Sequence, residues 1–445
     1  MNKINSLFVL LFIASTSVFA QSNKDLKDVK YRRSSLHTIL MESDDFPMKA
    51  KVLTVYNNLP FPDKYENHTI GEKSFDPKKY PLTKEERETL LPKKSKLSGF
   101  TKGLTSDVTG GIVDSTEADT PFVIEKYLKQ NKIANKLVAK WFDRKADGTM
   151  GYKLISDRGQ INASFLDVKK AEASSDGNAI ITTAGLELID NTFIVVNKLK
   201  FIPNEPVARA VRDVAIETAN GMSVEFLKTK AIQLAEKMYE STKEGYSVWT
   251  TSYLYKLKWD DVTSNTFYEE LYVENETEAN SAEKIKKFDS SDLFQLEYVG
   301  TENSSTLVTF SLKEKRTEDQ IIDLSVTRNV DNVYAKLQKK YDVFKVKTPL
   351  YAGNPITAKI GMKEGLEAGD KFEVLEANLD EKTGKTVYKK VGSIKVNKKL
   401  IWDNRYNTNG GAVSENETEV SPAIDVTTFD GGDKFYSGML IRQIK

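Results

Sequence analysis

One stretch near the middle of the chain constrains the fold more than any other. Residues Asp190 to Ile202 (DNTFIVVNKLKFI) form a long run rich in β-branched and aromatic side chains. Such a run is typical of a buried strand, because branched and aromatic side chains pack well on a pleated surface. Helical patterns lie before and after it, so the sequence indicates an α/β arrangement with this strand inside.

The pattern before this run predicts a helix, a strand and a second helix. Thr120 can cap a helix over 121–142, because its first residue is a proline and apolar side chains then recur at helical spacing. We expect a short strand over 151–157 and a short helix over 161–171. With the elements that follow the central run, they indicate an α/β layered domain over residues 118–245.

Two further helices follow the central run. The first opens at Pro206 and ends before Gly221, a residue type that favours a helix C-terminus, and the second begins near Ser223. Side chains recur at helical spacing in both. In the first helix they are Val207, Val211, Val214 and Thr218, and in the second Phe226, Leu227, Leu234, Met238 and Tyr239.

From Tyr246 onward the apolar pattern changes to a period of two, the repeat of a strand. One face of this strand carries Trp249, Thr251, Tyr253, Tyr255, Leu257 and Trp259. A second strand is predicted over 267–273, after a turn. Later elements are a hairpin over 293–312, a helix over 331–341 and a strand over 343–347. We assign residues 246–348 to a second, mixed region of strands and helices.

The first twenty residues have the pattern of a secretory signal. Lys3 supplies positive charge, Leu7 to Ala14 is an uninterrupted apolar run, and small residues ending at Ala20 predict cleavage before Gln21. The apolar stretch is shorter than the ~20 residues that a membrane-spanning helix needs. Residues 1–20 therefore predict an exported protein without an integral membrane span, soluble after cleavage, in the periplasm or at the cell surface.

The two ends of the mature chain differ in character. Residues 21–117 predict a loop-rich amino-terminal region, in which 48–56 alternates briefly and is predicted as a strand, and 103–117 is predicted as a linker. Five prolines disfavour regular structure between them. They are Pro60, Pro62, Pro77, Pro81 and Pro92. Residues 349–445 carry many short strand patterns separated by glycine turns, which predict a small β-barrel.

Composition excludes several classes of function. The chain has 65 basic and 64 acidic residues, so its formal net charge of +1 gives no electrostatic case for nucleic-acid binding. It has no cysteine, which excludes disulfides, thiolate metal sites and a lipidated cysteine. Its only histidines, His37 and His68, are too few for a three-histidine metal site, and we expect each to be structural or exposed.

The sequence carries no common catalytic signature. H-E-x-x-H, G-x-S-x-G, the phosphate-binding glycine-lysine loop and G-x-G-x-x-G after a strand are all absent. Asp260-Asp261 fits a turn better than a glycosidase pair, because adjacent strand residues point to opposite faces. The Asp157-Arg158 pair is interpreted as architectural. We therefore expect no enzyme, no catalytic or metal-binding residues and no cofactor.

The aromatic strand face admits two interpretations. Trp249, Tyr253, Tyr255 and Trp259 could form a platform for a sugar, or they could be core against a neighbouring helix. Stripes of this kind are more often core. The platform remains open as a tentative ligand site, and a secreted carbohydrate-binding or carbohydrate-cleaving protein is the alternative function, with a glycan as partner.

Two segments resemble envelope proteins. The helix ending in LVAKWF (137–142), GYKLISDR (151–158) and GLELIDNTFIVV (185–196) resemble the α/β domain shared by the curli-secretion channel protein CsgG and the amino-terminal domain of TolB. The segment from GLEAGDKFEVLE (365–376) to VGSIKV (391–396) is similar to the small barrel of the flagellar T-ring protein FlgT. Channel-forming relatives carry a lipidated cysteine and a membrane-inserting hairpin, and this sequence shows neither.

The resemblance implies a TolB-like layered domain followed by a small barrel, in an envelope protein that assembles with others. It supplies no reaction, and we do not extend secretion-channel activity to this chain. The leading expectation is a non-enzymatic, exported cell-envelope protein that acts as an interaction or assembly module. Its expected partners are other envelope proteins, and self-association into a homo-oligomer is possible.

Overall fold

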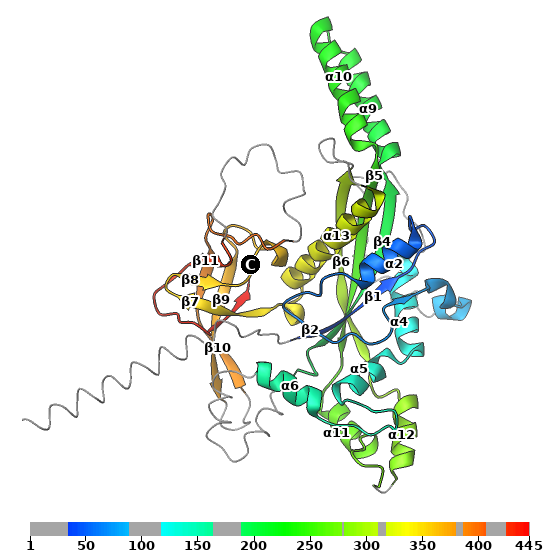
Figure 1. Cartoon of the computed structure of the whole chain (residues 1–445), viewed down its shortest axis with the longest axis vertical. Coiled ribbons are helices and arrows are strands. Elements are labelled where there is room, and N and C mark those ends of the chain that lie inside the picture. Colours follow the sequence, from blue (N-terminus) through cyan, green and yellow to red (C-terminus); the bar gives the residue numbers. More distant parts are fainter. Residues whose placement is uncertain are drawn as a thin grey trace, which may run out of the picture.

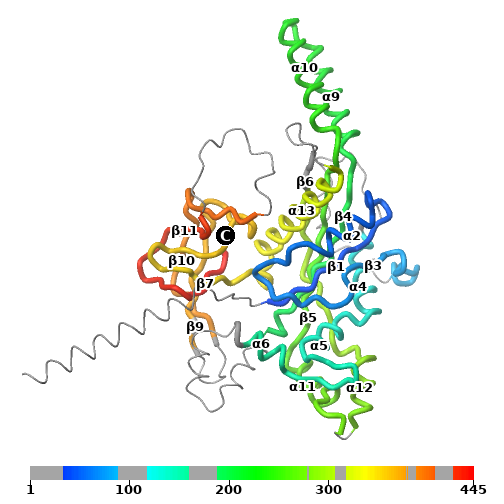
Figure 2. Tube along the Cα trace, in the orientation of Figure 1, coloured from blue at the N-terminus to red at the C-terminus, as the bar shows by residue number. Residues whose placement is uncertain are grey.

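The computed structural model describes residues 34–88, 117–162, 188–277, 280–309, 317–379, 386–405 and 424–444. This part of the chain combines a mixed β-sheet flanked by helices with a closed antiparallel β-barrel. Figures 1 and 2 show the barrel beside the sheet and a two-helix hairpin projecting from one end of the sheet. The predicted mixed α/β character and the small barrel are confirmed.

The sheet has the strand order β2-β1-β4-β5-β6, and β3 also pairs with β1. β1 runs parallel to β2, β3 and β4, whereas β5 runs antiparallel to both of its neighbours, β4 and β6. The strands are β1 (Ser35–Met41), β2 (Glu66–Asn67), β3 (Ser74–Phe75), β4 (Thr192–Pro203), β5 (Gly245–Leu257) and β6 (Leu296–Thr309). One sheet thus joins strands from the three segments 21–117, 118–245 and 246–348.

Helices cover both faces of the sheet. They are α2 (Lys49–Asn57), α4 (Thr120–Gln130), α5 (Ile133–Trp141) and α13 (Glu318–Lys340). Under α2 and α13, Leu36, Val195 and Val326 belong to one buried core. Under α4 and α5, Ile194 and Leu137 belong to another. Successive β4 side chains point to opposite faces of the sheet, and helices cover both faces. Odd- and even-numbered residues of β4 are therefore both buried, which explains its unbroken apolar run.

A third core lies where three short helices gather at the other end of the sheet. They are α6 (Lys153–Asn162), α11 (Asp261–Glu270) and α12 (Ser281–Ser290). The rings of Phe142 and Phe267 lie 4.6 Å apart at its centre, and Phe288 and Phe294 are buried with them. This aromatic core joins α5 and α6 to the β5–β6 connection.

The barrel closes in the order β10-β11-β8-β7-β12-β9, and every pairing is antiparallel. Its strands are β7 (Lys347–Gly353), β8 (Ile356–Ala358), β9 (Lys371–Leu379), β10 (Thr386–Val396), β11 (Thr427–Asp430) and β12 (Leu440–Gln443). Phe372, Ile394 and Phe429 fill its interior. Closure leaves no unpaired edge on the barrel, which protects such short strands from pairing elsewhere.

The projecting hairpin connects β4 to β5. It consists of α9 (Asn204–Asn220) and α10 (Glu225–Thr242). β5 then begins at Gly245, whose φ of 102° lies in the left-handed region that favours glycine. Since Pro203 pairs with Tyr246 across the sheet, the hairpin is inserted at the very end of the β4–β5 ladder. The two helices predicted from Pro206 and Ser223 are thereby confirmed, as are the central strand and the strand from Tyr246.

Several predicted strands are helices instead. Residues 48–56 lie almost wholly in α2, where Val52, Val55 and Tyr56 share the buried face. Residues 151–157 enter α6, and 267–273 overlap the end of α11 and the turn after it. The period-two pattern in each segment was too short to exclude a helix, and burial on a helical face decided the outcome.

Three other boundaries also differ from the predictions. The expected helix over 121–142 is two helices, α4 and α5, because Lys132 adopts a left-handed conformation with a φ of 51°. β6 runs straight through the turn expected within 293–312. The strand expected over 343–347 starts instead with a 3₁₀ turn at Asp342–Phe344, and only Lys347 belongs to a strand, β7. Predictions for the signal segment 1–20 and most of the linker 103–117 and the helix 161–171 concern residues outside the described ranges.

Candidate functional site

The α9–α10 hairpin has an interior made of small side chains. Ala208 and Ala219 of α9 and Ala235 of α10 are buried. Alanine lets two helix backbones approach closely, but it buries little apolar surface. The fully buried positions between the two helices therefore hold alanine, while Ile216, Ile232 and Tyr239 are half-buried.

Contacts at the base of the hairpin fix it to the sheet. Ser247 of β5 donates a hydrogen bond of 2.9 Å to the side-chain oxygen of Asn204, and Asn204 donates to the Glu244 carbonyl at 3.2 Å. Higher up, the Tyr239 hydroxyl donates to Glu205 at 3.0 Å, and the Arg212 guanidinium lies 4.5 Å from the centre of the Tyr239 ring. These contacts join the first turns of α9 to the last turns of α10.

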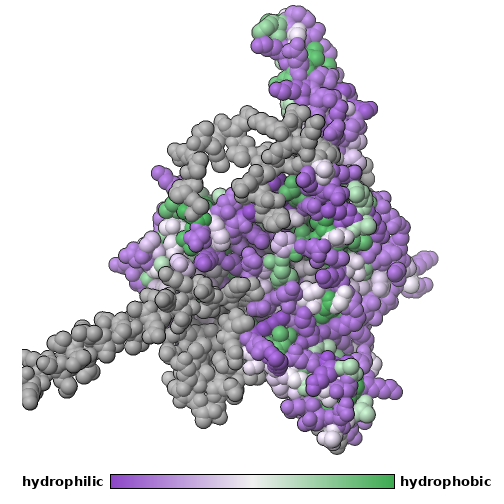
Figure 3. Space-filling model, in the orientation of Figure 1, coloured by the Kyte–Doolittle hydropathy of each residue, from purple (hydrophilic) through white to green (hydrophobic). Residues whose placement is uncertain are grey.

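Most of the large apolar side chains of the hairpin face solvent. Seven side chains within α9 and α10 are more than half exposed: Phe226 of α10, whose ring centre lies 4.7 Å from the Lys230 ammonium, and six others, three on each helix, that recur at helical spacing. These six are Val207, Val211, Val214, Leu227, Leu234 and Met238. Figure 3 shows hydrophobic patches along the projecting hairpin. We call these six side chains the apolar face.

The six side chains lie on one side of the hairpin. On each helix the apolar stripe precedes the alanine stripe by one residue, as Val207 precedes Ala208 and Leu234 precedes Ala235. One residue turns a helix by about 100°. Because α9 and α10 run in opposite directions, this turn carries both stripes to the same side of the pair. The hairpin thus presents an exposed apolar face two helices wide, a feature typical of interaction sites.

A pocket of about 120 Å³ lies between β1, α2 and α13. Its lining includes Thr38, Tyr56, Asp331 and Tyr334. Burial raises the pKa of Asp331 to about 6, and Lys363 acts in the opposite direction. Among the described lining residues Asp331 is the sole carboxylate, and none is a histidine. The pocket therefore holds one carboxyl group together with Lys73 and two tyrosine hydroxyls.

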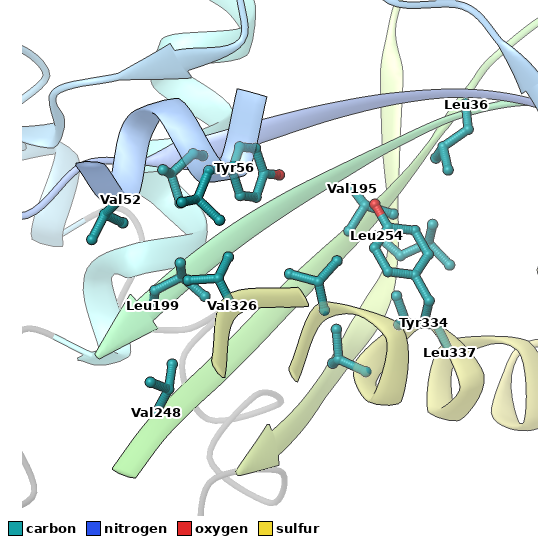
Figure 4. Packing of buried hydrophobic residues seen from close by; sticks show 14 of the residues in the cluster. Leu36, Val52, Tyr56, Val195, Leu199, Val248, Leu254, Val326, Tyr334 and Leu337 are labelled. Atoms are coloured by element: carbon teal, nitrogen blue, oxygen red, sulfur yellow. The ribbon is translucent and has the colours of Figure 1, made fainter. Parts of the chain in front are cut away.

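Tyr56 of α2 and Tyr334 of α13 belong to the core between these helices and the sheet (Figure 4). Asn197 of β4 donates a 2.6 Å hydrogen bond to the Tyr56 hydroxyl and accepts one from Ser252 of β5. The Tyr334 hydroxyl is buried nearby and completes no hydrogen bond in the described part of the chain. Burial raises the pKa of Tyr56 to about 12 and that of Tyr334 well above its usual value, so both phenols stay neutral. These four side chains therefore form a small polar cluster inside an otherwise apolar core.

Both histidines are buried rather than exposed. His68 stacks on Trp141 with ring centres 4.9 Å apart, and Arg158 lies 4.5 Å above the same indole. Arg158 also donates to Ser35 at 2.8 Å and to the Asn67 carbonyl at 2.9 Å. Burial lowers the pKa of Arg158 to about 10, and burial and then Arg158 lower that of His68 well below its usual value. The group ties α6 to β1 and β2.

His37 lies on β1, on the face that α4 and α5 cover. It is fully buried, and neither ring nitrogen completes a hydrogen bond in the described structure. Burial lowers its pKa to about 4, and Glu72 opposes that shift in part. The imidazole is therefore neutral near pH 7 and is part of the buried interior.

The structure divides the predicted aromatic platform. Tyr253 and Tyr255 are buried under α4 and α5, where the Tyr255 hydroxyl donates to the Pro121 carbonyl at 3.4 Å. Trp259 packs in the third core, with its ring centre 5.5 Å from that of Phe267. Trp249 is only partly buried and lies toward the hairpin end of β5. The four side chains therefore do not share one accessible surface.

Residues from the two charged pairs noted in the sequence, Asp260-Asp261 and Asp157-Arg158, have local structural roles. Asp260 is the N-cap of α11 and accepts a hydrogen bond of 2.8 Å from the Thr263 amide, which holds its pKa below the usual range. Asp157 forms an ion pair with Lys153 at 2.6 Å, whereas its neighbour Arg158 points into the core. Asp157 and Arg158 were expected at the end of a strand but lie in α6. Neighbouring residues of a helix point about 100° apart, so Asp157 faces solvent and Arg158 faces the core.

Within the described ranges, no three histidine, aspartate or glutamate side chains cluster in a way that would hold a metal ion. In the same ranges, no helix combines the length and the apolar character needed to cross a bilayer. Comparison with protein-family models and with curated proteins finds no match to this chain. The strongest candidate site on the described surface is therefore the apolar face of α9–α10. Sequence periodicity predicted both helices and their apolar stripes. It did not indicate whether those stripes are buried or exposed.

Proposed function

We propose that this chain is a non-enzymatic protein of the cell envelope that acts as an assembly module. The observation that carries the proposal is the apolar face of α9–α10, which is held away from the body and left uncovered by the described residues. Exposed apolar surface costs free energy in water, about 25 cal/mol per Å². A face of this kind on a rigid projection is best explained by a protein partner that covers it.

The first twenty residues and the resemblance to other envelope proteins support the location. The apolar run Leu7 to Ala14 and the small residues ending at Ala20 favour export with cleavage before Gln21. The described residues form a layered sheet and a closed barrel, and we propose from the sequence resemblance that these correspond to a TolB-like domain followed by a FlgT-like barrel. If the proposal is right, the mature protein starts at Gln21 and is recovered from the periplasm or the cell surface; a cytoplasmic protein that retains Met1 would contradict it.

Site-specific photo-crosslinking in the organism that makes the protein tests the binding face. A photoreactive amino acid is placed at Val211 or at Leu234 on the apolar face, and at Thr229 as a matched exposed control. Thr229 is suitable because it follows Lys228 on the interior side and so lies on the opposite side of the hairpin. We expect crosslinks to an envelope protein, identified by mass spectrometry, from the first two positions and not from Thr229. Equal labelling from all three, or none from any, would contradict the proposal.

A further inference from the structure

We propose that the partner of the apolar face is a second copy of this chain. Two hairpins would pack face to face as a four-helix bundle, with α9 of one copy against α10 of the other. This inference rests on the proposed function, because it names the partner that the same face binds. It is carried by the spacing of the apolar side chains and by the charges along the edges of the face.

The spacing of the apolar side chains suits helix-on-helix packing. Val207, Val211 and Val214 are four and three residues apart, and Leu234 and Met238 are four apart. Alternating steps of three and four residues place side chains along the seam of a helical bundle, where each inserts between side chains of the facing helix. A second hairpin supplies two such seams at once, which matches a face two helices wide.

The edges of the face carry opposite charges. On the outer edge of α9 lies Glu217, and on the outer edge of α10 lie Lys230 and Lys237. These three side chains form no ion pair within the described residues of the chain. The contact between Arg212 and Glu236 aligns the two helices and places Glu217 at about the height of Lys230. The hairpin therefore has one acidic and one basic edge at matching heights.

This charge pattern selects one arrangement of two copies. A two-fold axis parallel to the hairpin brings α9 against α10 of the second copy, so Glu217 meets Lys230 of the second copy in two equivalent pairs. A two-fold axis across the hairpin brings α10 against α10, so that the basic edges oppose each other, which is repulsive. The first arrangement also makes facing helices antiparallel and places both protein bodies at the same end of the bundle.

Charge also distinguishes a second copy from a lipid surface. Residues 204–242 contain six acidic and five basic side chains, so the hairpin is close to neutral. Helices that lie on membranes combine an apolar face with a lysine- and arginine-rich polar face, which attracts anionic lipids. The polar side of this hairpin instead carries Glu236 and Glu240 beside Arg209. The hairpin lacks the basic surplus that such binding requires.

Sedimentation equilibrium of the purified mature protein across the micromolar range tests self-association. We expect the wild-type protein and the Thr229→Asp control to be dimers and Leu234→Asp to be a monomer, with unchanged helix content by circular dichroism. A wild-type monomer across that range, or a Leu234→Asp dimer as tight as wild type, would overturn the proposal.

Charge exchange tests the arrangement itself. Glu217→Lys and Lys230→Glu should each weaken the dimer about 5- to 30-fold, because each single change places like charges together twice per dimer. The double variant Glu217→Lys/Lys230→Glu should recover to near the wild-type affinity. A double variant as weak as the two single changes combined would overturn the pairing of α9 with α10.

The outcomes separate this inference from the proposed function. If the purified protein is a monomer while crosslinks from Val211 in cells reach a different envelope protein, the inference is wrong and the proposed function holds. If vesicles of anionic lipid recruit the monomeric wild type and not Leu234→Asp, the face binds a membrane and the inference is wrong. If the protein is a dimer but is found only in the cytoplasm, the inference holds and the proposed function fails.

Discussion

Arg158 fixes the tautomer of His68. The guanidinium nitrogen Nη1 lies 2.9 Å from His68 Nδ1, and His68 Nε2 lies 2.9 Å from the carbonyl oxygen of Leu137. A guanidinium only donates hydrogen bonds, so Nδ1 must accept, and Nε2 must carry the proton that it donates to Leu137. A neutral histidine is thus held between a buried cation and the backbone of α5.

The first prediction concerns this tautomer. In ¹⁵N-resolved NMR spectra of the folded protein, His68 should show a protonated Nε2 and an unprotonated Nδ1 throughout the neutral range. Replacing Arg158 by alanine should destabilise the protein by about 2 to 4 kcal/mol, because it removes several buried hydrogen bonds and the contact with Trp141. Arg158→Lys should recover little of that loss, since an ammonium cannot reach all three acceptors. A protonated Nδ1 would contradict the geometry.

The second prediction is a loss of stability in acid from the buried histidines. Burial lowers the pKa of His37 from 6.5 to about 4, so below pH 6.5 the unfolded chain takes up a proton that the folded chain refuses. The free energy of unfolding therefore falls as the pH drops from 6.5 to 4, by about 3 kcal/mol for His37. His68, with a pKa lowered well below normal, acts in the same direction.

Asp331 opposes this loss and provides the control. Its pKa is raised by burial to about 6, so between about pH 6 and 3.8 the folded chain binds a proton that the unfolded chain does not. Asp331 therefore adds stability as the pH falls through that window. Urea unfolding across the same range should show a steeper acid loss for Asp331→Asn and a shallower one for His37→Asn. Parallel profiles for wild type and Asp331→Asn would show that the carboxyl titrates normally.

The third prediction decides between core and sugar platform for Trp259. Its ring lies among Phe142, Phe267 and Phe294, so Trp259→Ala should lower the free energy of unfolding by about 2 to 4 kcal/mol. Trp249→Ala, at a partly buried position, should cost less than half as much. A Trp259→Ala variant that keeps full stability and loses binding on a glycan array would favour the carbohydrate-binding alternative.

The fourth prediction concerns the independence of the hairpin from the body. Replacing residues 205–244 by a two-residue Asn-Gly turn should leave the body folded, because β4 and β5 already pair up to Pro203 and Tyr246 and the turn then joins Asn204 directly to Gly245. The melting temperature should change by no more than a few degrees, measured by calorimetry. A large loss of stability would show that the hairpin supports the sheet.

Sequence reasoning succeeded where one signal dominated. The run from Asp190 to Ile202 is β4, the period-two stretch from Tyr246 is β5, and the helices from Pro206 and Ser223 are α9 and α10. In each case the pattern is long enough that only one periodicity fits it. The barrel was predicted from a different signal, the repetition of short strand patterns separated by glycine turns.

Short segments failed because two periodicities fitted them equally. Residues 48–56 show alternation, but Val52, Val55 and Tyr56 also share a helical face, and packing under α13 favoured the helix. The segment 267–273 has apolar residues at Phe267 and Leu271, a spacing of four that a helix buries on one side. Neighbours distant in sequence supplied the deciding contacts.

The sequence by itself determined which faces of the long elements are apolar, since side-chain periodicity follows from local backbone geometry. Only the tertiary structure decided what those faces meet. Tyr255 is fully buried under α4 and α5, while Leu234, on an equally regular stripe, is 59% exposed. Whether a side chain is buried depends on all the elements packed around it, because water is excluded only where a second surface packs against the first. The periodicity of one segment carries no information about that second surface.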